Sequence, residues 1–302
     1  MAAIARRRDL GLASVFALGL MSTLAVAQNA SPPVDDGTRT PGQIGPENRV
    51  QLSMFEPEGA ERFPGWEDVA DAVVRVSCNG GSTGGGVLIG AGDLMITAGH
   101  VFFNEDGSQS TDRTNCVAIH PRGDVVTIRD DTIKSGGFAV PAALGTHFSV
   151  GVTAVDWAIV ELSRAPHRAA PLPLAGRDEL ILYQGQPVLN ISGPHDNFEV
   201  SGFLAQVCTY FGTPPTASAL DENNRIYGRP AAPGDELRVA RYDCDLGLGG
   251  SGSPIIGWYQ GEPYVWGILT DSLRGQDRCE RVQRTSCYSA GPLVTAMDMV
   301  PR

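Results

Sequence analysis

The chain has 302 residues, of which 42% are hydrophobic and 19% are charged, and its formal net charge at pH 7 is -11. This composition excludes a chain that is disordered throughout, because the apolar side chains suffice for a sizeable buried core. The negative charge argues against nucleic acid or anionic lipid as the main partner, since a surface of this sign repels phosphate. A core of this size fits one large domain or two barrels of roughly 100 residues each.

The first 27 residues have the features of a signal peptide. A basic run at residues 6–8 precedes a mostly apolar stretch at residues 10–26, and residues 25–27 form a small-x-small cleavage sequence. We expect cleavage before Gln28 and a secreted or periplasmic protein that is free of the membrane afterwards. An uncleaved membrane anchor is the alternative, because the apolar stretch approaches the length that spans a bilayer.

Residues 28–48 are rich in Pro, Gly, Asn, Asp and Ser, and they show almost no apolar periodicity. This composition predicts a flexible leader or pro-segment. We expect the folded domain to cover residues 49–302.

Short β-like runs, separated by turn residues, follow from about residue 70. The first series comprises residues 72–78, 85–89, 93–97, 116–120, 125–129 and 157–162. A proline-bearing stretch at residues 163–177 separates it from a second series at residues 187–191, 199–210, 236–242, 254–259 and 263–270. Regularly spaced short strands indicate an all-β sandwich or barrel. Two series of similar strand count suggest two barrels, at about 65–163 and about 178–300. Residues 293–300 are a candidate for a short terminal helix, although their periodicity is too brief to count.

Six cysteines are present, and an even count in an exported chain predicts three disulfides. Sequence alone leaves the pairing open. We favour the pairs Cys78 with Cys116, Cys208 with Cys244, and Cys279 with Cys287. No C-x-x-C pair or H-E-x-x-H sequence occurs in the chain, so we expect no metal site.

The sequence Gly-Gly-Ser-Gly-Ser-Pro at residues 249–254 suits a serine nucleophile. Serine chemistry needs a hydroxyl that an imidazole activates, and backbone N–H groups aimed at the developing oxyanion. Glycines before Ser251 let the N–H groups of Gly249 and Ser251 converge on one point, which predicts an oxyanion hole. A surface turn rich in glycine and serine is the alternative for this stretch taken alone.

Two other segments carry the partners that such a serine needs. His100 ends the sequence Ile-Thr-Ala-Gly-His, and Asp156 begins the sequence Asp-Trp-Ala-Ile-Val. In the order His, Asp, Ser, the three segments resemble the signature regions of the chymotrypsin-like serine proteases, over roughly residues 45–300. The resemblance implies an all-β fold of two antiparallel Greek-key β-barrels with the active site in the cleft between them. It also implies a catalytic triad of His100, Asp156 and Ser251.

Chain order excludes the α/β-hydrolases, in which the histidine follows the serine and the nucleophile lies in G-x-S-x-G. No histidine lies beyond His195, and a serine stands two residues after the nucleophile. A subtilisin-like order would need an aspartate before His100, for which Asp71 and Asp93 are available. That fold requires alternating helices, however, and the pattern lacks them.

The other histidines lie in loops or at strand ends without a matching motif, so we expect solvated or structural roles for them. They are His120, His147, His167 and His195. Three aspartates compete with Asp156 for the carboxylate role, but they belong to a charged, exposed-looking run. They are Asp124, Asp130 and Asp131. Asp156 is followed by apolar residues that would bury it, as an orienting carboxylate requires.

Thr270 ends an apolar run that follows the nucleophile. In the proteases that the chain resembles, this strand lines the substrate cleft, and a hydroxyl at this position bonds the triad aspartate. The resemblance therefore implies a hydrogen bond between Thr270 and Asp156. It also implies substrate binding by Thr270, Asp271 and Ser272, through backbone pairing with an extended peptide.

Within this family, residues 45–51 and the Gly-Ser-Gly-Ser-Pro ending resemble the bacterial glutamyl endopeptidase branch. Those relatives have a histidine where Leu269 stands and a hydroxyl residue where Leu246 stands, so acidic specificity is not expected. Animal trypsins carry an aspartate where Gly250 stands, and it pairs with the freed N-terminal amine on activation. Activation of this chain by loss of a leader would need another mechanism.

Asp245 lies six residues before Ser251. It matches the position whose carboxylate makes trypsins select Arg or Lys, because a buried carboxylate pairs strongly with a guanidinium. The alternative is an aspartate bonded in a turn or at the surface.

Together these features predict a serine endopeptidase that cleaves proteins or peptides through an acyl-enzyme intermediate. Side chains supply the acid, base and nucleophile, so we expect no cofactor. The negative net charge argues against a nucleic-acid partner. We also expect a monomer. Two alternatives stay open: a catalytically silent protein that binds peptides in the same cleft, and an esterase on the same scaffold.

Overall fold

The computed structural model describes residues 49–79, 81–104, 106–138, 153–176, 179, 185–193, 202–212, 238–247, 249–272, 289–294 and 297. For residues 81–83 and 271–272 only the backbone is described. All these residues belong to one compact unit, residues 39–302. The predicted signal peptide and leader, Cys279, Cys287, His147, His195 and most of the predicted terminal helix lie outside the described residues.

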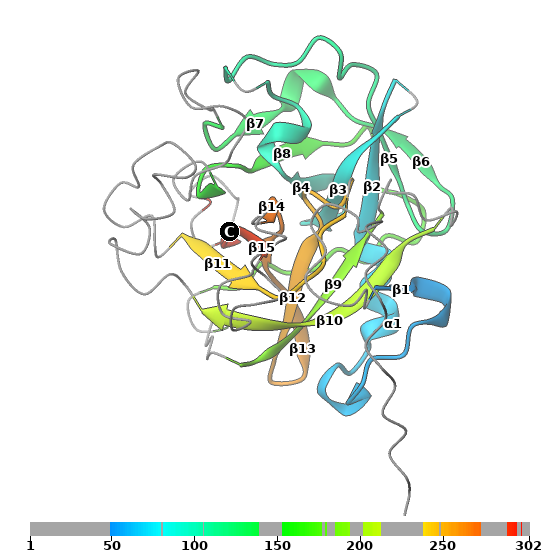
Figure 1. Ribbon diagram of the computed structural model, residues 1–302. Helices are drawn as coiled ribbons and strands as arrows, with labels where there is room; N and C mark the ends of the chain where they lie inside the picture. Colours follow the sequence, from blue (N-terminus) through cyan, green and yellow to red (C-terminus); the bar gives the residue numbers. More distant parts are fainter. Residues whose placement is uncertain are drawn as a thin grey trace, which may run out of the picture. The chain divides into compact units, whose positions relative to one another are not determined.

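The first sheet is antiparallel and has the strand order β6-β5-β2-β3-β4-β8-β7 (Figure 1). Its strands are β2 (Val73–Cys78), β3 (Gly81–Ile89), β4 (Leu94–Thr97), β5 (Val117–Ile119), β6 (Val125–Thr127), β7 (Lys134–Ser135) and β8 (Ala158–Glu161). Valine and isoleucine dominate several of these strands, and such β-branched side chains pack well on a pleated sheet. The sheet curls around its own core, which contains Val74, Val76, Leu88, Met95 and Phe102.

The second sheet has the order β13-β12-β9-β10-β11-β15-β14, and β1 pairs with β10 beside this path. Its strands are β1 (Val50–Gln51), β9 (Pro187–Ser192), β10 (Leu204–Gly212), β11 (Val239–Tyr242), β12 (Pro254–Tyr259), β13 (Glu262–Ile268), β14 (Asp271–Ser272) and β15 (Ser289–Pro292). Strand β1 precedes the first sheet in the chain but joins the second, because it pairs antiparallel with β10.

Helical structure is sparse in the described ranges. The α-helix α1 covers Trp66–Val69, and short 3-10 helices cover Leu52–Met54 (η1), Ala60–Arg62 (η2), Ala70–Ala72 (η3), Gly99–Val101 (η4) and Asp130–Thr132 (η5). No helix in the described part of the chain is long and apolar enough to cross a membrane. The architecture is therefore nearly all β, with two curled antiparallel half-barrel sheets, as predicted.

Packing and hydrogen bonds connect the two sheets. The larger core cluster includes Val73 and Val87 of the first sheet and Val188 and Ile255 of the second. The connection at residues 163–176 bonds to both sheets: the N–H of Leu172 donates to Leu88 of β3, and the N–H of Val265 of β13 donates to Pro173. This stretch, predicted as a linker, lies directly on the two barrels that it joins.

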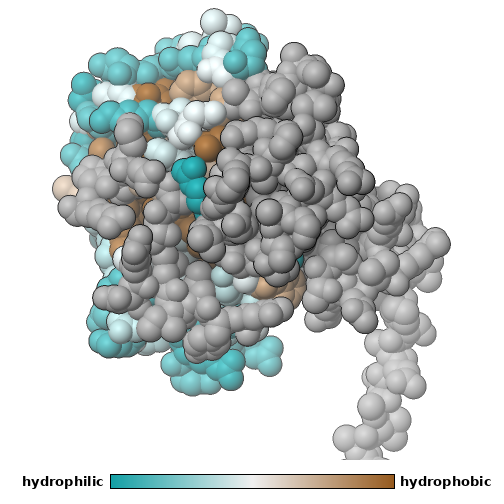
Figure 2. Space-filling view, turned by 90° about the vertical axis from the view of Figure 1, so that its left-hand side faces the viewer, coloured by the Kyte–Doolittle hydropathy of each residue, from teal (hydrophilic) through white to brown (hydrophobic). Residues whose placement is uncertain are grey.

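Most described side chains on the strands face inward. Figure 2 shows one face of the molecule, on which hydrophilic residues cover the upper and lower parts of the described surface. Among the described residues, the large hydrophobic side chains that are exposed are Val50, Met54 and Val125.

Two of the three predicted disulfides are confirmed. Cys78 at the end of β2 is bonded to Cys116, and Cys208 in β10 is bonded to Cys244. The first bond joins two neighbouring strands of one barrel. The second attaches the residue before Asp245 to β10, next to the predicted nucleophile segment.

Candidate active site

Pairing of β4 with β8 brings His100 and Asp156 together. The two strands are antiparallel, and Thr97 lies opposite Ala158. The chain leaving β4 at Thr97 enters η4, which contains His100, and the chain approaching β8 passes through Asp156. Because these chain ends lie at the same edge of the sheet, two residues that are 56 positions apart become neighbours.

Asp156 forms two hydrogen bonds with His100. Its Oδ2 lies 2.7 Å from the ring Nδ1, and its Oδ1 accepts the backbone N–H of His100 at 2.8 Å. Asp156 is fully buried, whereas the side chain of His100 is 19% exposed. A carboxylate accepts hydrogen bonds, so the proton of the neutral imidazole lies on Nδ1. Nε2 is then left as a base, which is the tautomer that serine chemistry requires.

Gly99 makes this close approach possible. A Cβ at position 99 would lie 3.1 Å from Oδ1 of Asp156 and 3.0 Å from Cβ of Phe138. Phe138 is itself buried, and its ring centroid lies 5.9 Å from that of His100. A side chain at position 99 would therefore push the carboxylate or the phenyl ring away from the histidine.

Arg113 contributes a positive charge near Asp156. Burial lowers the pKa of the Arg113 guanidinium, and the charges of Asp112 and Asp156 act in the opposite direction. An arginine nevertheless keeps its charge in proteins, so it attracts the carboxylate of Asp156. Sequence reasoning gave no signal for this residue.

Ser251 lies in a tight glycine-rich turn. Gly249 and Gly252 have φ angles of 79° and 87°, in the left-handed region that favours glycine. The N–H of Gly250 donates to Gly247, and the N–H of Ser253 donates to Gly250, both at 3.0 Å. These bonds make a compact turn with Ser251 at its centre.

The N–H groups of this turn differ in their partners. Those of Gly250, Gly252 and Ser253 each donate to a backbone carbonyl. Those of Gly249 and Ser251 have no acceptor among the described residues. The two groups that the sequence predicts as an oxyanion hole are thus the ones without a bond to the described part of the chain.

The turn docks against the segment that leads to His100. The N–H of Gly85 in β3 donates to the carbonyl of Ser251 at 2.7 Å. A Cβ at Gly252 would collide with the hydroxyl of Thr97, which itself donates to Gly85 at 2.6 Å. Thr97 precedes His100 by only three positions, so Ser251 is held against the strand end that carries the His100–Asp156 pair.

The consecutive glycines of β3 allow this docking. A Cβ at Gly84 would lie 2.6 Å from Val101 and 2.7 Å from the carbonyl of Ser251, and one at Gly85 would lie 3.3 Å from Ser253. The sequence predicts an ordinary strand at residues 85–89. Its run of glycines was nevertheless a signal, because glycine inside a strand often marks the close approach of another backbone.

The predicted substrate-binding residues flank this site in the chain: Asp245 precedes the turn, and the other three follow Leu269, whose backbone bonds to Gly252 and Ser253. Asp245 and Thr270 are each only 2% exposed, and Asp271 and Ser272 form β14, which pairs with β15. The expected bond between Thr270 and Asp156 is wrong: Oγ1 of Thr270 is buried and has no hydrogen-bond partner within the described part of the chain. Each oxygen of the Asp156 carboxylate lies within hydrogen-bond distance of a nitrogen of His100, so Asp156 is held without the threonine.

Two of the alternative carboxylates, Asp124 and Asp71, pair with arginines. Asp124 forms two bonds of 2.8 Å to Arg164, and these bonds lower the pKa of the Asp124 carboxyl well below its usual range. Asp71 binds Arg122 in the same bidentate way, at 2.6 and 2.7 Å. These pairs hold loops of the first barrel.

His120 and His167 also have structural surroundings. Buried His120 lies 3.0 Å from the carbonyl of Asp71 through Nε2, and its Nδ1 accepts the N–H of Arg122. The backbone N–H of His167 donates to Asp124. In the described part of the chain, no group of three or more His, Cys, Asp or Glu side chains is arranged to hold a metal ion.

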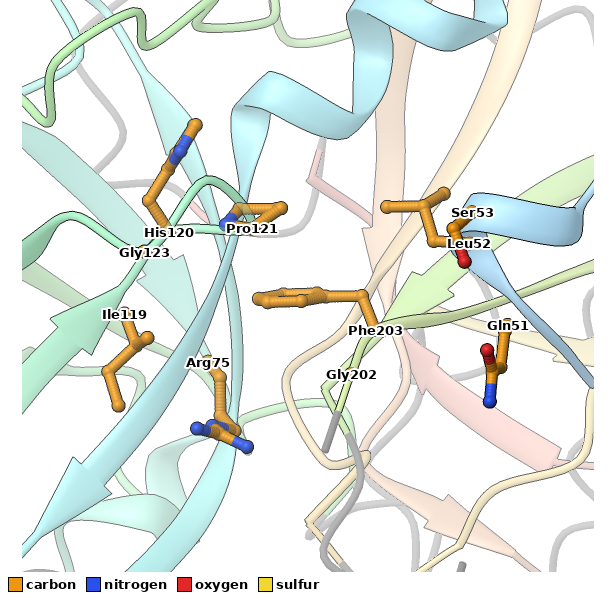
Figure 3. A pocket seen from close by; sticks show the side chains of 10 residues that line it. All are labelled: Gln51, Leu52, Ser53, Arg75, Ile119, His120, Pro121, Gly123, Gly202 and Phe203. Carbon is orange, nitrogen blue, oxygen red and sulfur yellow. The ribbon is translucent and has the colours of Figure 1, made fainter. Parts of the chain in front are cut away.

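A hollow of about 460 Å³ lies elsewhere, between the N-terminal segment, β2, the β5–β6 turn and the start of β10 (Figure 3). Its lining residues are Gln51, Leu52, Ser53, Arg75, Ile119, His120, Pro121, Gly123, Gly202 and Phe203. None of the predicted catalytic or substrate-binding residues lines it. The candidate active site is therefore defined by its hydrogen bonds rather than by this hollow.

Comparison with known proteins agrees with this fold. Residues 81–268 match the family model of the trypsin-like peptidase domain. The fold is similar to a Glu endopeptidase in complex with MPD, with a TM-score of 0.52, 13% identity, and coverage of 84% of this chain and 97% of the other. It is also similar to neuropsin, a serine protease expressed in the limbic system of mouse brain, with a TM-score of 0.50, 13% identity and coverage of 76% and 92%.

A search of curated protein sequences found no match. Likeness at 13% identity shows the fold, which is that of the chymotrypsin-like proteases, and leaves the glutamyl endopeptidase branch a prediction. The family match extends over more than half of the chain, from β3 to the end of β13. The chain therefore belongs to the trypsin-like peptidase family.

Proposed function

We propose that the protein is a serine endopeptidase in which Ser251 is the nucleophile, His100 the general base and Asp156 the orienting carboxylate. The observation that carries this proposal is the doubly bonded pair of His100 and Asp156, with the Ser251 turn docked beside it. A carboxylate that holds both the ring and the backbone of one histidine leaves that ring little freedom to turn.

The reaction follows from these positions. Nε2 of His100 accepts the hydroxyl proton of Ser251 as Oγ attacks the peptide carbonyl, and the imidazolium then protonates the leaving amine. Water, deprotonated by the same imidazole, releases the acyl group. Asp156 stabilises the imidazolium in both halves of the reaction.

The unpaired N–H groups of Gly249 and Ser251 support an oxyanion hole. Their neighbours in the turn are bonded to carbonyls, whereas these two have no acceptor among the described residues. Donors fixed in advance toward a developing oxyanion are a large source of catalysis, worth about 10²- to 10³-fold in kcat for each donor.

Strand β14 supports binding of an extended peptide. It lies at the end of the strand order of the second sheet, beside β15. An edge strand can add the backbone of a peptide as a further strand. We infer that substrate residues pair along Thr270, Asp271 and Ser272, next to the Ser251 turn.

Asp245 supports selection of Arg or Lys before the cleaved bond. Asp245 is 2% exposed and lies at the start of the nucleophile segment. Leu246 and Leu269 are buried apolar side chains, and they would oppose an acidic substrate side chain. A buried carboxylate favours a guanidinium partner strongly.

The two disulfides support a secreted or periplasmic location, because such bonds persist in oxidising compartments. Protein or peptide substrates, a monomeric state and the absence of a nucleic-acid partner are parts of the same proposal.

The test is hydrolysis of unfolded protein and labelling by a serine-directed phosphonate. Ser251→Ala should lose hydrolysis by about 10³-fold or more and should lose the label. Ser108→Ala, in an exposed turn, is the matched control and should retain both. A wild-type protein that neither hydrolyses nor takes the label, or a Ser251→Ala variant that does both, would overturn the proposal.

A further inference from the structure

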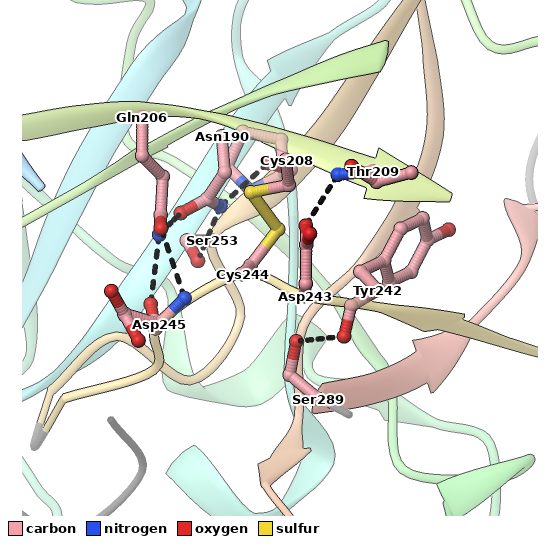
Figure 4. Close-up of a disulfide and its surroundings, with 11 residues drawn as sticks. Asn190, Gln206, Cys208, Thr209, Tyr242, Asp243, Cys244, Asp245, Ser253 and Ser289 are labelled. Carbon is pink, nitrogen blue, oxygen red and sulfur yellow. Dashed lines mark hydrogen bonds between the residues drawn. A yellow bond between two sulfur atoms is a disulfide. The ribbon is translucent and has the colours of Figure 1, made fainter. Parts of the chain in front are cut away.

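Two buried side-chain amides hold the ends of the segment that carries Ser251, which we call the nucleophile loop and define as residues 245–254. Asn190 lies in β9 and Gln206 in β10, and each is 1% exposed. They face each other directly across the two strands. Figure 4 shows that both side chains point toward the loop, from the same sheet.

Gln206 binds the start of the loop. Its Oε1 accepts the backbone N–H of Asp245 at 2.9 Å, and its Nε2 donates to the carbonyl of the same residue at 2.8 Å. One amide therefore holds both backbone groups of Asp245. These bonds distinguish the nitrogen from the oxygen of the Gln206 amide, because the amide N–H must face an acceptor and the amide oxygen must face a donor.

Asn190 binds the end of the loop. Its Nδ2 donates to the hydroxyl of Ser253 at 3.0 Å and to the carbonyl of Pro254 at 2.9 Å. Its Oδ1 accepts the second N–H of Gln206 at 3.0 Å. All four N–H donors of the two amides are thus used, and the bonds run without a break from Asp245 to Pro254.

Burial of these two amides destabilises the fold unless all of their hydrogen bonds are formed. A buried amide that lacks partners destabilises a fold, so two amides inside a barrel require an explanation. The partners of this pair are groups of the nucleophile loop. The Cys208–Cys244 disulfide reinforces the same attachment, because Cys208 is two residues after Gln206 and Cys244 directly precedes Asp245.

We propose that Asn190 and Gln206 are positioning residues that hold the nucleophile loop in its catalytic conformation before substrate binds. The inference rests on the proposed function. The loop contains four glycines, at positions 247, 249, 250 and 252, which give its backbone much freedom to lose on ordering. Fixing both ends on one rigid sheet restricts the turn, so the N–H groups of Gly249 and Ser251 stay directed at one point.

The test compares near-isosteric variants that lack the hydrogen bonds, Gln206→Met and Asn190→Leu. Displacement of reacting groups by about 1 Å costs up to roughly 100-fold. We expect kcat to fall about 10- to 100-fold in both variants. In Asn190→Leu, KM should change by less than about threefold, because the contacts along β14 and the bonds from Gln206 to the backbone of Asp245 are retained. Hydrogen exchange of the amides at 249–253 should be about 10-fold faster or more.

Ile191→Val is the matched control. Ile191 is fully buried, is adjacent to Asn190 in β9, and belongs to the larger core cluster rather than to the amide network. This variant should weaken the barrel but leave kcat and loop exchange unchanged. If Gln206→Met or Asn190→Leu fails to fold, Ser253→Ala removes a single bond of Asn190 and should lower kcat by about 3- to 10-fold.

The outcomes separate this proposal from the proposed function. Variants that keep both wild-type kcat and wild-type loop exchange would overturn the positioning role. Faster loop exchange together with a lower kcat, in the variants but not in the control, supports it. If the wild type has no hydrolytic activity, the proposed function fails, and unchanged loop exchange in the variants would then refute the anchoring as well.

Discussion

The carboxylate of Asp156 binds both the ring and the backbone of His100, through hydrogen bonds of 2.7 and 2.8 Å. The first bond sets the tautomer of the imidazole, and the second fixes the carboxylate relative to the chain that carries the ring. Because β4 and β8 pair next to this site, the backbone of the sheet fixes the positions of His100 and Asp156 relative to each other.

Asp156→Asn should abolish most activity without unfolding the protein. An asparagine amide facing Nδ1 would donate to it, which moves the ring proton to Nε2 and removes the base. We expect kcat to fall about 10⁴-fold at neutral pH. Asp131→Asn, at a carboxylate that is 76% exposed, is the control and should change kcat little. Full activity of Asp156→Asn in a peptide-cleavage assay would contradict the assigned role.

Gly99→Ala should disturb the hydrogen-bonded pair of His100 and Asp156. The new Cβ would contact Oδ1 of Asp156 and the side chain of Phe138 at about 3 Å, so one of them must move. We expect a loss of roughly 10- to 100-fold in kcat and about 1–3 kcal/mol in the free energy of unfolding. Kinetics and urea unfolding measure these quantities.

Gly176→Ala provides the comparison for this variant. Its Cβ would meet the carboxylate tip of Glu179, which can rotate away. That variant should therefore be close to wild type in both assays. An equal effect of the two substitutions would show that the packing around Gly99 has no special role.

Asp245→Asn should change which bonds are cut. The substitution keeps the backbone bonds to Gln206 and removes the negative charge. Loss of a buried ionic partner costs about 2–5 kcal/mol, so kcat/KM for Arg or Lys substrates should fall roughly 30- to 5,000-fold. Substrates with leucine at that position should change far less. Cleavage profiling on a peptide library measures this, and a wild type without preference for basic residues would refute the assignment.

Asp124 predicts a specific dependence of stability on pH. Hydrogen bonds from Arg164 lower the pKa of Asp124 in the folded protein below its ordinary value of 3.8. The ion pair therefore stabilises the fold at a pH above this ordinary value, and the contribution is lost as the pH falls below it. Asp124→Asn should unfold at a lower temperature than wild type at pH 6, and the difference should shrink at about pH 2–3. A difference that does not depend on pH would exclude the carboxylate as its source.

The two disulfides should differ in their effect on activity although they close chain segments of similar length, 38 and 36 residues. Loop-closure entropy predicts a similar loss of stability, about 4 kcal/mol, when either pair is replaced by serine. Only the Cys208–Cys244 bond adjoins the nucleophile loop, so only its removal should also lower kcat in protein that is still folded. Equal kcat values for the two double variants, measured well below their unfolding temperatures, would contradict this.

Local pattern predicted the longer strands well. The runs at 254–259 and 187–191 became β12 and β9 nearly unchanged, because their β-branched and aromatic residues suit a pleated sheet. Strands β1, β7 and β14 are too short for alternation to show, and β15 consists of Ser, Ala, Gly and Pro, which are not typical strand residues. Those strands exist because neighbouring strands supply their hydrogen-bond partners.

For the site, the chain order of His100, Asp156 and Ser251 and the glycines around the serine were readable in the sequence, because short motifs record local backbone requirements. The assumed bond from Thr270 was wrong, since a motif does not show which groups a buried hydroxyl will reach. Asn190 and Gln206 were visible as single amides within apolar strands, yet their partners in the nucleophile loop lie 39 to 64 positions away. Residue types and their periodicity thus specify elements and candidate chemistry, whereas strand register and packing decide which distant polar groups meet, because those contacts exist only once both sheets have formed.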